Sequence, residues 1–325
     1  MRPVKKYASV LLVLVSLASS APLQAQTYPV KPVRMVIPYA PGGGADTTGR
    51  LFAQKYGELW KEQVVVDNRG GAGGNIGADA VAKSAADGHT ILFTTNALSI
   101  SAALYRKLPF DPLRDLAPVT QLTAAVLFVA TSSKLPAANL KELIALAKAQ
   151  PGKLNYGTTG VGGTSHFAGA MFASSAGINI VMVPYKGDAL SMPALISGDI
   201  HIVFAPMAAV APHVATGRVR LLAVSANARV KKVPDIPTVA EAGLPDYEYS
   251  GWLGLFAPAG TPRDIQARIS NDGARIVSVP EMEKRLSDSG LEVAGSSPEQ
   301  FAIRYRADIE KFRRTMQVAG IPPEE

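Results

Sequence analysis

Three consecutive glycines, placed between a short apolar run and an amphipathic stretch, constrain the fold of this chain more than any other feature. Residues 33–37 are mostly apolar and predict a short buried strand. The glycines at 42–44 allow backbone N–H groups to approach a ligand closely, because no Cβ is in the way. Asp46 and the two threonines after it are helix N-cap types, and apolar side chains recur at helical spacing over 52–60. We therefore expect a strand, a glycine turn and a helix.

A strand, a glycine turn and a helix N-terminus can together form an anion-binding site. Free N–H groups point outward from the first helical turn, and the helix dipole favours negative charge there. A plain β–α turn also uses glycine and aspartate. On residues 39–50 alone, both interpretations stay open.

The first 25 residues predict a signal peptide. Arg2, Lys5 and Lys6 form a basic start. Residues 10–17 are apolar but too short to span a bilayer. Ala25 offers a small residue before a cleavage point. We therefore expect a chain that is exported to the periplasm and cleaved near Ala25, with no membrane-spanning stretch after it.

The composition argues against disulfide bonds, a lipid-anchor cysteine and a nucleic-acid partner. The 325 residues include no cysteine, so the sequence has neither a disulfide framework nor a cysteine for a lipid anchor. The formal net charge is +7, and removing the three basic residues of the signal lowers it by three, to +4. This mild excess contains no basic run, so we expect no nucleic-acid partner.

The sequence contains no motif that supports catalysis or a cofactor. Ser165 and His166 are neighbours in sequence, which does not make a nucleophile and its base, and no G-x-S-x-G elbow is present. Ile76 stands where a dinucleotide fingerprint needs its third glycine, and no phosphate-binding loop occurs. The four histidines show no metal-ligand spacing. We therefore expect no enzyme, no cofactor and no metal site.

The β–α pattern occurs twice in the chain. A long helical pattern covers residues 298–316. Before it, strand and helix patterns alternate over residues 33–92, with a short buried strand expected at 64–66, and start again near residue 154, with a second loop of glycines and hydroxyls at 157–166. Such alternation predicts parallel sheets that bind ligands at the carboxyl ends of their strands. Apolar stretches at 124–131 and 249–257 are expected to cross between two lobes. The glycine loops would then face each other across a cleft, which suits a small molecule with carboxylates at both ends.

Seven short motifs resemble those of one known family. They lie at residues 38–46, 68–77, 87–90, 108–112, 156–166, 183–187 and 237–243. In their order and spacing, from about Tyr28 onward, the chain resembles the extracytoplasmic solute receptors of the tripartite tricarboxylate transporters, often called the Bug family. One glycine turn would be weak evidence, whereas this series covers the whole mature chain.

The resemblance implies an α/β fold of two lobes, like a type II periplasmic binding protein, with two crossover segments and a ligand cleft between the lobes. Lobe 1 would comprise residues 26–124 and 252–325, and lobe 2 residues 125–251. It also implies a monomeric receptor that closes like a Venus flytrap on a small organic anion, a carboxylate, and delivers it to integral-membrane transporter subunits. A periplasmic sensor that passes its ligand state to a signalling receptor would use the same fold, so this alternative stays open.

The resemblance further implies which residues hold the ligand. They are Tyr39, Gly42, Gly43, Asp46, Thr95 and Asn96 in the first lobe, and Gly160, Gly163, Thr164, Ser165, His166, Tyr185 and Lys186 in the second. The charge of Asp46 would repel a carboxylate, so capping or loop geometry is favoured over direct contact. Lys186 would either pair with a carboxylate or be solvated. Ala205 stands where family members often carry an aspartate, which argues against an amino-acid ligand.

Overall fold

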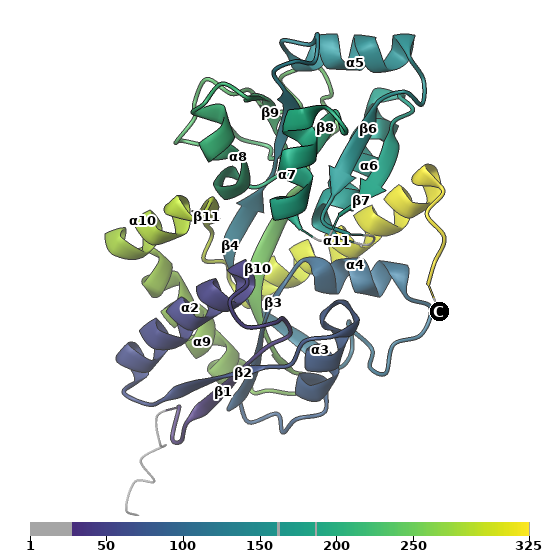
Figure 1. The fold of residues 1–325 in the computed structure, drawn as a ribbon. Coiled ribbons are helices and arrows are strands. Elements are labelled where there is room, and N and C mark those ends of the chain that lie inside the picture. Colours follow the sequence, from purple (N-terminus) through teal and green to yellow (C-terminus); the bar gives the residue numbers. More distant parts are fainter. Residues whose placement is uncertain (1–27, 161–162, 186, 325) are drawn as a thin grey trace, which may run out of the picture.

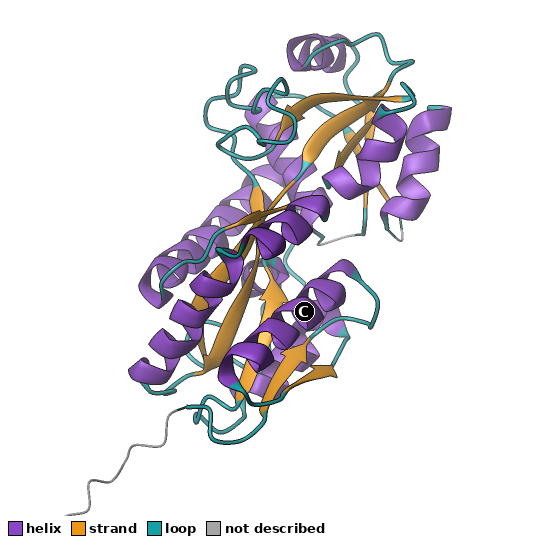
Figure 2. Cartoon of the chain, turned by 90° about the vertical axis from the view of Figure 1, so that its left-hand side faces the viewer, coloured by secondary structure: helices purple, strands orange, loops and turns teal. Residues whose placement is uncertain are grey.

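The chain folds into two lobes, each built on its own β-sheet. The computed structural model describes residues 28–160, 163–185 and 187–324. Figure 1 shows one lobe above the other, and Figure 2, turned by 90°, shows helices packed around both sheets. Within these described ranges, no helix is long and apolar enough to cross a membrane.

The first lobe contains a six-stranded sheet with the order β11-β4-β10-β3-β1-β2. Its strands are β1 (Val33–Ile37), β2 (Val64–Asn68), β3 (Thr90–Thr95), β4 (Leu116–Val126), β10 (Ser250–Pro258) and β11 (Leu291–Val293). β1 pairs in parallel with β2 and β3, as the alternation predicts. β10 runs antiparallel to β3 and β4, and β11 runs antiparallel to β4. The sheet is therefore mixed, because the chain returns to this lobe through β10.

Helices cover both faces of the first sheet. They are α2 (Gly44–Trp60), the 3₁₀ turn η1 (Ala72–Gly74), α3 (Asn75–Ala82), α4 (Ala97–Leu104), α9 (Arg263–Val277), α10 (Pro280–Asp288) and α11 (Pro298–Ala319). The apolar face predicted for α2 is buried, with Phe52 and Tyr56 both 0% exposed. Tyr56 also donates its hydroxyl to the Ile269 carbonyl at 2.9 Å, which fixes α9 beside α2.

The second lobe contains a five-stranded sheet with the order β7-β6-β8-β5-β9. Its strands are β5 (Phe128–Ser132), β6 (Asn155–Thr158), β7 (Val181–Pro184), β8 (Ile202–Ala205) and β9 (Val219–Val224). Its helices are α5 (Leu140–Ala149), α6 (Thr164–Ala176), α7 (Asp188–Ser197) and α8 (Met207–Val214). β6 is parallel to β7 and β8, so the loops that follow these strands emerge at one edge of the sheet.

Two segments cross between the lobes next to each other. Leu127 lies between β4 and β5, and residues 225–249 lie between β9 and β10. The Leu127 N–H donates to Ser225 Oγ at 2.9 Å, and the Ser225 N–H donates to the Leu127 carbonyl at 2.8 Å. The Tyr249 N–H donates to the Ser225 carbonyl at 2.8 Å. Hydrogen bonds at Ser225 therefore tie the two crossings together.

Two helices of the first lobe also reach the core of the second. Ile100 and Leu104, on α4, belong to the buried cluster that fills the second lobe. On α11, Phe312 lies edge-on to Phe167 of α6, with ring centroids 5.2 Å apart. The N-terminal half of α11 packs instead in a first-lobe cluster with β10. The lobes therefore share packed side chains in addition to the two crossings.

Several elements differ from the sequence-based expectation. Residues 64–66 were expected to be buried, but β2 is an edge strand with Val65 50% exposed. α2 begins at Gly44, after the N-cap Gly43, and so starts before the Asp46 side chain that was expected to cap it. α4 and α8 were not predicted, because their residues show no clear amphipathic period.

Candidate functional site

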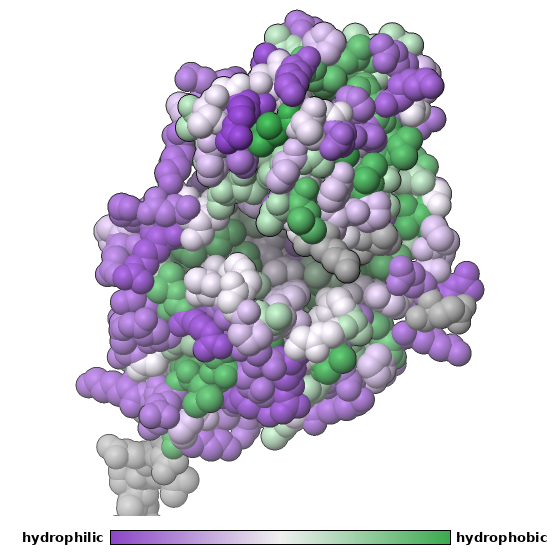
Figure 3. Space-filling view, viewed as in Figure 1, coloured by the Kyte–Doolittle hydropathy of each residue, from purple (hydrophilic) through white to green (hydrophobic). Residues whose placement is uncertain are grey.

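A cavity of about 510 Å³ is formed by residues of both lobes. From the first lobe it is lined by residues 38–40, which follow β1, by the glycine-rich stretch 70–74 and by one face of α4. Gly163 lines it from the second lobe. In Figure 3 the surface is hollowed between the lobes, and pale and green residues border the hollow. The first-lobe loops in this lining follow β1, β2 and β3. The cavity thus lies at the carboxyl ends of parallel strands, where such sheets bind ligands.

Two glycine N-caps bring helix N-termini to this cavity. α3 begins after Gly74 and α6 begins after Gly163, and both glycines line the cavity. A glycine has no side chain to cap the N–H groups of the first turn, so the positive end of each helix dipole faces the cavity without a side-chain cap, although the Asn75 N–H at the start of α3 already donates to the Ala72 carbonyl. Gly74 has a φ of 101°, a conformation that glycine adopts readily. This arrangement favours a negatively charged ligand.

Asp46 holds the first glycine loop in place. Its carboxylate accepts the Gly42 N–H at 2.8 Å, Asn68 Nδ2–H at 2.8 Å and Arg50 Nε–H at 3.0 Å, and the residue is 2% exposed. The hydrogen-bonded Arg50 guanidinium, aided by Gly42 and Asn68, lowers the pKa of Asp46 to about 2 in spite of desolvation. This placement supports the favoured expectation of a loop-holding role over direct ligand contact.

Tyr39, which lines the cavity, forms a hydroxyl cluster with Thr94 and Thr95. The Tyr39 hydroxyl lies 2.7 Å from Thr95 Oγ1 and 3.1 Å from Thr94 Oγ1. Burial raises the pKa of Tyr39, although these hydrogen bonds partly oppose the shift, so the phenol stays protonated at neutral pH. Asn96 is placed differently, since it is 2% exposed and its amide donates to the Tyr249 hydroxyl at 3.0 Å. Asn96 therefore connects α4 to the second crossing.

The second lobe repeats the loop-holding device with a neutral side chain. Ser165, in the first turn of α6, is 3% exposed, and its Oγ accepts the Thr159 N–H at 2.8 Å. Thr159 Oγ1 lies 3.1 Å from the same oxygen. Gly160 has a φ of 134°, and the Gly163 N–H donates to its carbonyl at 3.3 Å. Thr164, the first residue of α6, is half-buried beside this loop.

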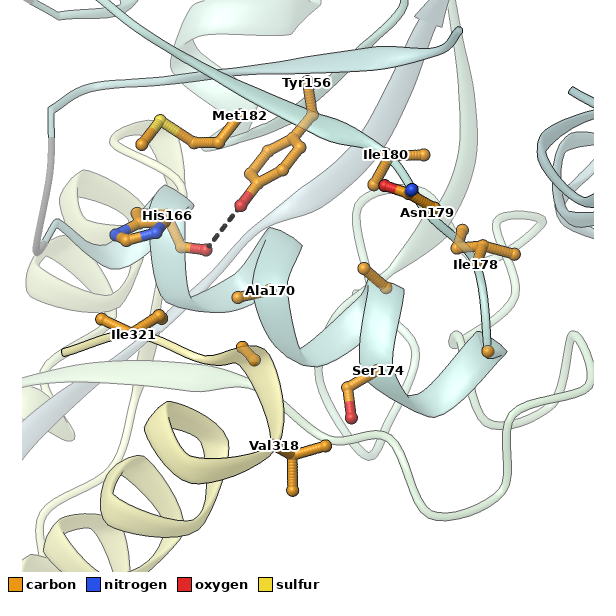
Figure 4. A pocket seen from close by; sticks show the side chains of 13 residues that line it. Tyr156, His166, Ala170, Ser174, Ile178, Asn179, Ile180, Met182, Val318 and Ile321 are labelled. Atoms are coloured by element: carbon orange, nitrogen blue, oxygen red, sulfur yellow. Dashed lines mark hydrogen bonds between the residues drawn. The ribbon is translucent and has the colours of Figure 1, made fainter. Parts of the chain in front are cut away.

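His166 lines a different cavity from Tyr39 and Gly163. This second cavity, of about 430 Å³, lies between α6, the stretch that leads into β7, and the end of α11. Figure 4 shows His166 beside Met182 and Ile321, with the Tyr156 hydroxyl directed at the His166 carbonyl at 3.5 Å. Burial lowers the pKa of His166, which favours a neutral imidazole. The structure thus separates His166 from the shared cavity.

The remaining second-lobe candidates follow β7. Tyr185 is half-buried, packs beside Gly157, and donates its N–H to the Thr158 carbonyl at 2.9 Å. Lys186, predicted as a ligand residue, lies outside the described residues. Asp188, the first residue of α7, is half-buried, and burial raises its pKa.

The main feature that the sequence analysis missed is α4. Ala97, Ile100, Ser101 and Leu104 all line the shared cavity, and they project from one face of this helix. A signal was available, because Asn96 is a residue type that often precedes a helix and residues 97–104 contain no glycine or proline. Among the residues that the structure describes, no group of three or more His, Cys, Asp or Glu side chains could hold a metal ion.

Comparison with known proteins identifies the family to which this chain belongs. The family model described as "Tripartite tricarboxylate transporter family receptor" matches residues 49–320. The chain belongs to this family. Its members are substrate-binding receptors, not enzymes. The match confirms the family resemblance inferred from the sequence, and the solved structures of relatives confirm the two-lobed α/β fold.

Individual relatives agree with this assignment. The protein BugT of Bordetella pertussis is 35% identical over 303 residues, which are 93% of each chain. A solved structure, R. palustris Rpa4515 with adipate, is 32% identical, has a TM-score of 0.78, and is matched over 91% of this chain and 100% of its own. The periplasmic binding protein BugD is 29% identical, has a TM-score of 0.75, and is matched over the same shares. The receptors of this family are periplasmic binding proteins.

Proposed function

We propose that this protein binds a small organic carboxylate between its lobes and delivers it to the membrane subunits of a tripartite tricarboxylate-type transporter. The observation that carries the proposal is the cavity shared by both lobes, which is lined by the N-cap glycines of α3 and α6. Helix N-termini stabilise anions, and a carboxylate fits their N–H groups. The adipate bound to Rpa4515 supports the same ligand class.

Binding is coupled to lobe closure in this proposal. A ligand that contacts Gly74 in one lobe and Gly163 in the other makes its full set of contacts only when the lobes come together, so it shifts the equilibrium towards the closed form. The lobes would comprise residues 26–124 with 252–325, and 125–251. The receptor acts as a monomer in the periplasm after its predicted signal peptide, residues 1–25, is removed. These residues lie outside the described part of the chain.

A thermal-shift screen of refolded protein against mono-, di- and tricarboxylates, amino acids and neutral solutes tests the proposal. A ligand at a hundred times its Kd adds about 2.7 kcal/mol to the free energy of unfolding and raises Tm by several degrees. The variant Gly163→Asp sharpens the test. Aspartate is a good N-cap, but its Cβ would lie 3.3 Å from the Gly160 carbonyl oxygen and from Thr159 Oγ1, so we expect a small loss of stability. The new carboxylate occupies the place of the ligand anion.

We expect Gly163→Asp to lower the Tm without ligand only slightly and to lose the carboxylate-dependent rise. The matched control is Ser297→Asp, which places the same side chain at the N-cap of α11, outside the described lining of the cavity. The control should keep the rise. If no carboxylate raises Tm, the carboxylate proposal fails. If a carboxylate does, but deleting the protein abolishes only a response and leaves uptake intact, the protein is a sensor.

A further inference from the structure

One wall of the shared cavity is an apolar helix face. Ala97, Ile100 and Leu104 line the cavity and lie at positions i, i+3 and i+7 of α4, so they project on the same side, and Ser101 at i+4 adds a hydroxyl to this mainly apolar face. Ile100 and Leu104 are 2% and 5% exposed and are packed into the second-lobe core, which fixes their positions. At 1.5 Å per residue, this face is roughly 10 Å long. A ligand lying along it would bury an apolar body of that length.

The start of this wall is polar and favours an anion. The Ala97 N–H donates to Thr95 Oγ1 at 3.2 Å, and the Tyr39 hydroxyl lies 2.7 Å from the same oxygen. The N-terminus of α4 carries the positive end of its dipole at this point. A carboxylate at this end therefore meets hydroxyl groups and a favourable field.

The far end of the wall carries a negative charge. Tyr105 and Glu324 line the cavity after Leu104. Two backbone hydrogen bonds of 2.9 Å hold Glu324 there, from its N–H to the Leu104 carbonyl and from the Arg106 N–H to the Glu324 carbonyl. Tyr105 and Glu324 also form an isolated β-bridge, so the two residues are neighbours, and burial together with the Glu324 carboxylate raises the pKa of Tyr105. The negative end of the α4 dipole lies at the same place, so a second ligand carboxylate would meet repulsion.

We propose that the preferred substrate is a monocarboxylate with an unbranched apolar body of at least five carbons, as in hexanoate. Its carboxylate binds at the end of the cavity that Tyr39 lines together with Gly74 and Gly163, the N-cap glycines of α3 and α6, and its body lies along α4 towards Glu324. The inference rests on the proposed function, because it names the ligand class of the same cavity. It also replaces the ligand with carboxylates at both ends that the facing glycine loops suggested from the sequence.

The first test is calorimetric titration of the refolded protein with propionate, butyrate, pentanoate and hexanoate, and with adipate and malate. Each buried CH₂ should raise the affinity about fourfold along the monocarboxylate series. Hexanoate should bind more tightly than adipate, which has the same number of carbons and one more charge. Affinity that does not change with chain length, or adipate or malate binding more tightly than hexanoate, would overturn the inference while leaving the proposed function intact. Failure of every carboxylate would defeat both.

The second test removes the charge at the far end. Glu324→Gln keeps the shape of an exposed side chain and deletes its carboxylate. We expect the ratio of hexanoate affinity to adipate affinity to fall roughly tenfold, because the affinity for adipate rises and the affinity for hexanoate changes little. Glu283→Gln, an exposed position on α10, is the matched control and should leave the ratio unchanged. An unchanged ratio in Glu324→Gln, or the same change in both variants, would contradict the role of Glu324.

Discussion

At the scale of single residues, Asp46 determines the shape of the first glycine loop. Asp46→Asn keeps the size of the side chain but removes the charge that accepts hydrogen bonds from Gly42 and Arg50. Charge-assisted hydrogen bonds of this kind contribute about 1.5–3 kcal/mol, so we expect a loss of that order in the free energy of unfolding, measured by urea denaturation. Asp235→Asn, at an exposed position, is the control. Equal stability of the two variants would contradict the loop-holding role.

The same carboxylate predicts a dependence of stability on pH. Its pKa in the folded protein is about 2, below the ordinary value of 3.8. The folded state therefore binds this proton less readily than the unfolded state. The stabilisation is fully present above pH 3.8 and is lost as the pH falls towards 2. Denaturation at a series of pH values should show this loss in the natural protein and a shallower slope over the same interval in Asp46→Asn.

The sequence predicts part of this residue-level picture. Arg50 lies four residues after Asp46 in a predicted helix, so their pairing follows from spacing. Asn68 is far along the chain, and its hydrogen bond to Asp46 arises only because β2 pairs with β1 and brings the two loops together. The placement of His166 could not be read from the sequence. This histidine belongs to the predicted loop in sequence, yet its position on α6 directs it to the second cavity.

At the scale of elements, α2 and α6 approach their sheets closely because each carries a glycine at the contact. A Cβ on Gly49 would lie 2.5 Å from Ile37 Cδ1 and 2.9 Å from Phe93 Cδ1, and a Cβ on Gly169 would collide with the Tyr156 ring. Alanine is the better helix former by about 1 kcal/mol, so propensity alone predicts that Gly49→Ala and Gly169→Ala stabilise the protein. We expect both to destabilise it, by about 1–3 kcal/mol, because the helix must move off the sheet.

Gly44→Ala supplies the control for this prediction. Gly44 is in the first turn of α2, and a Cβ there would meet no atom of the described structure within 4 Å. Its Tm, measured by circular dichroism without ligand, should equal or exceed that of the natural protein. If all three variants were equally stable, the close approach of helix to sheet would not limit stability.

Helices and strands were predicted correctly where the apolar residues are strongly periodic. The prediction failed where burial or helix formation depends on packing between distant segments. The strands and helices of the first β–α units were predicted because apolar runs and glycine turns mark them. The predicted burial of β2 was wrong. Three valines in a row indicate burial, and only the strand order shows that this strand is at the edge. α4 was missed because it is apolar on several sides, as expected for a helix that contacts both a core and a cavity.

At the scale of the whole molecule, α11 connects the cores of the two lobes. Its first half packs against Trp252 in the first lobe, and Phe312, later in the same helix, packs against Phe167 and Tyr249. The long helical pattern over residues 298–316 was predicted, but its partners were not, because its contacts join segments that are far apart in sequence. The lobe closure that we propose would therefore have to occur with α11 anchored to both cores.

Phe312→Ala tests this connection. Removing a large aromatic side chain that is 2% exposed costs about 3–5 kcal/mol when the cavity left behind does not collapse. Because the lost contacts join the two lobes, we expect calorimetry to resolve two unfolding transitions in place of one, with the second lobe melting first. Val318→Ala, 71% exposed on the same helix, should leave a single transition near the natural Tm. A single transition in Phe312→Ala, shifted by no more than in the control, would mean that the two crossings alone couple the lobes.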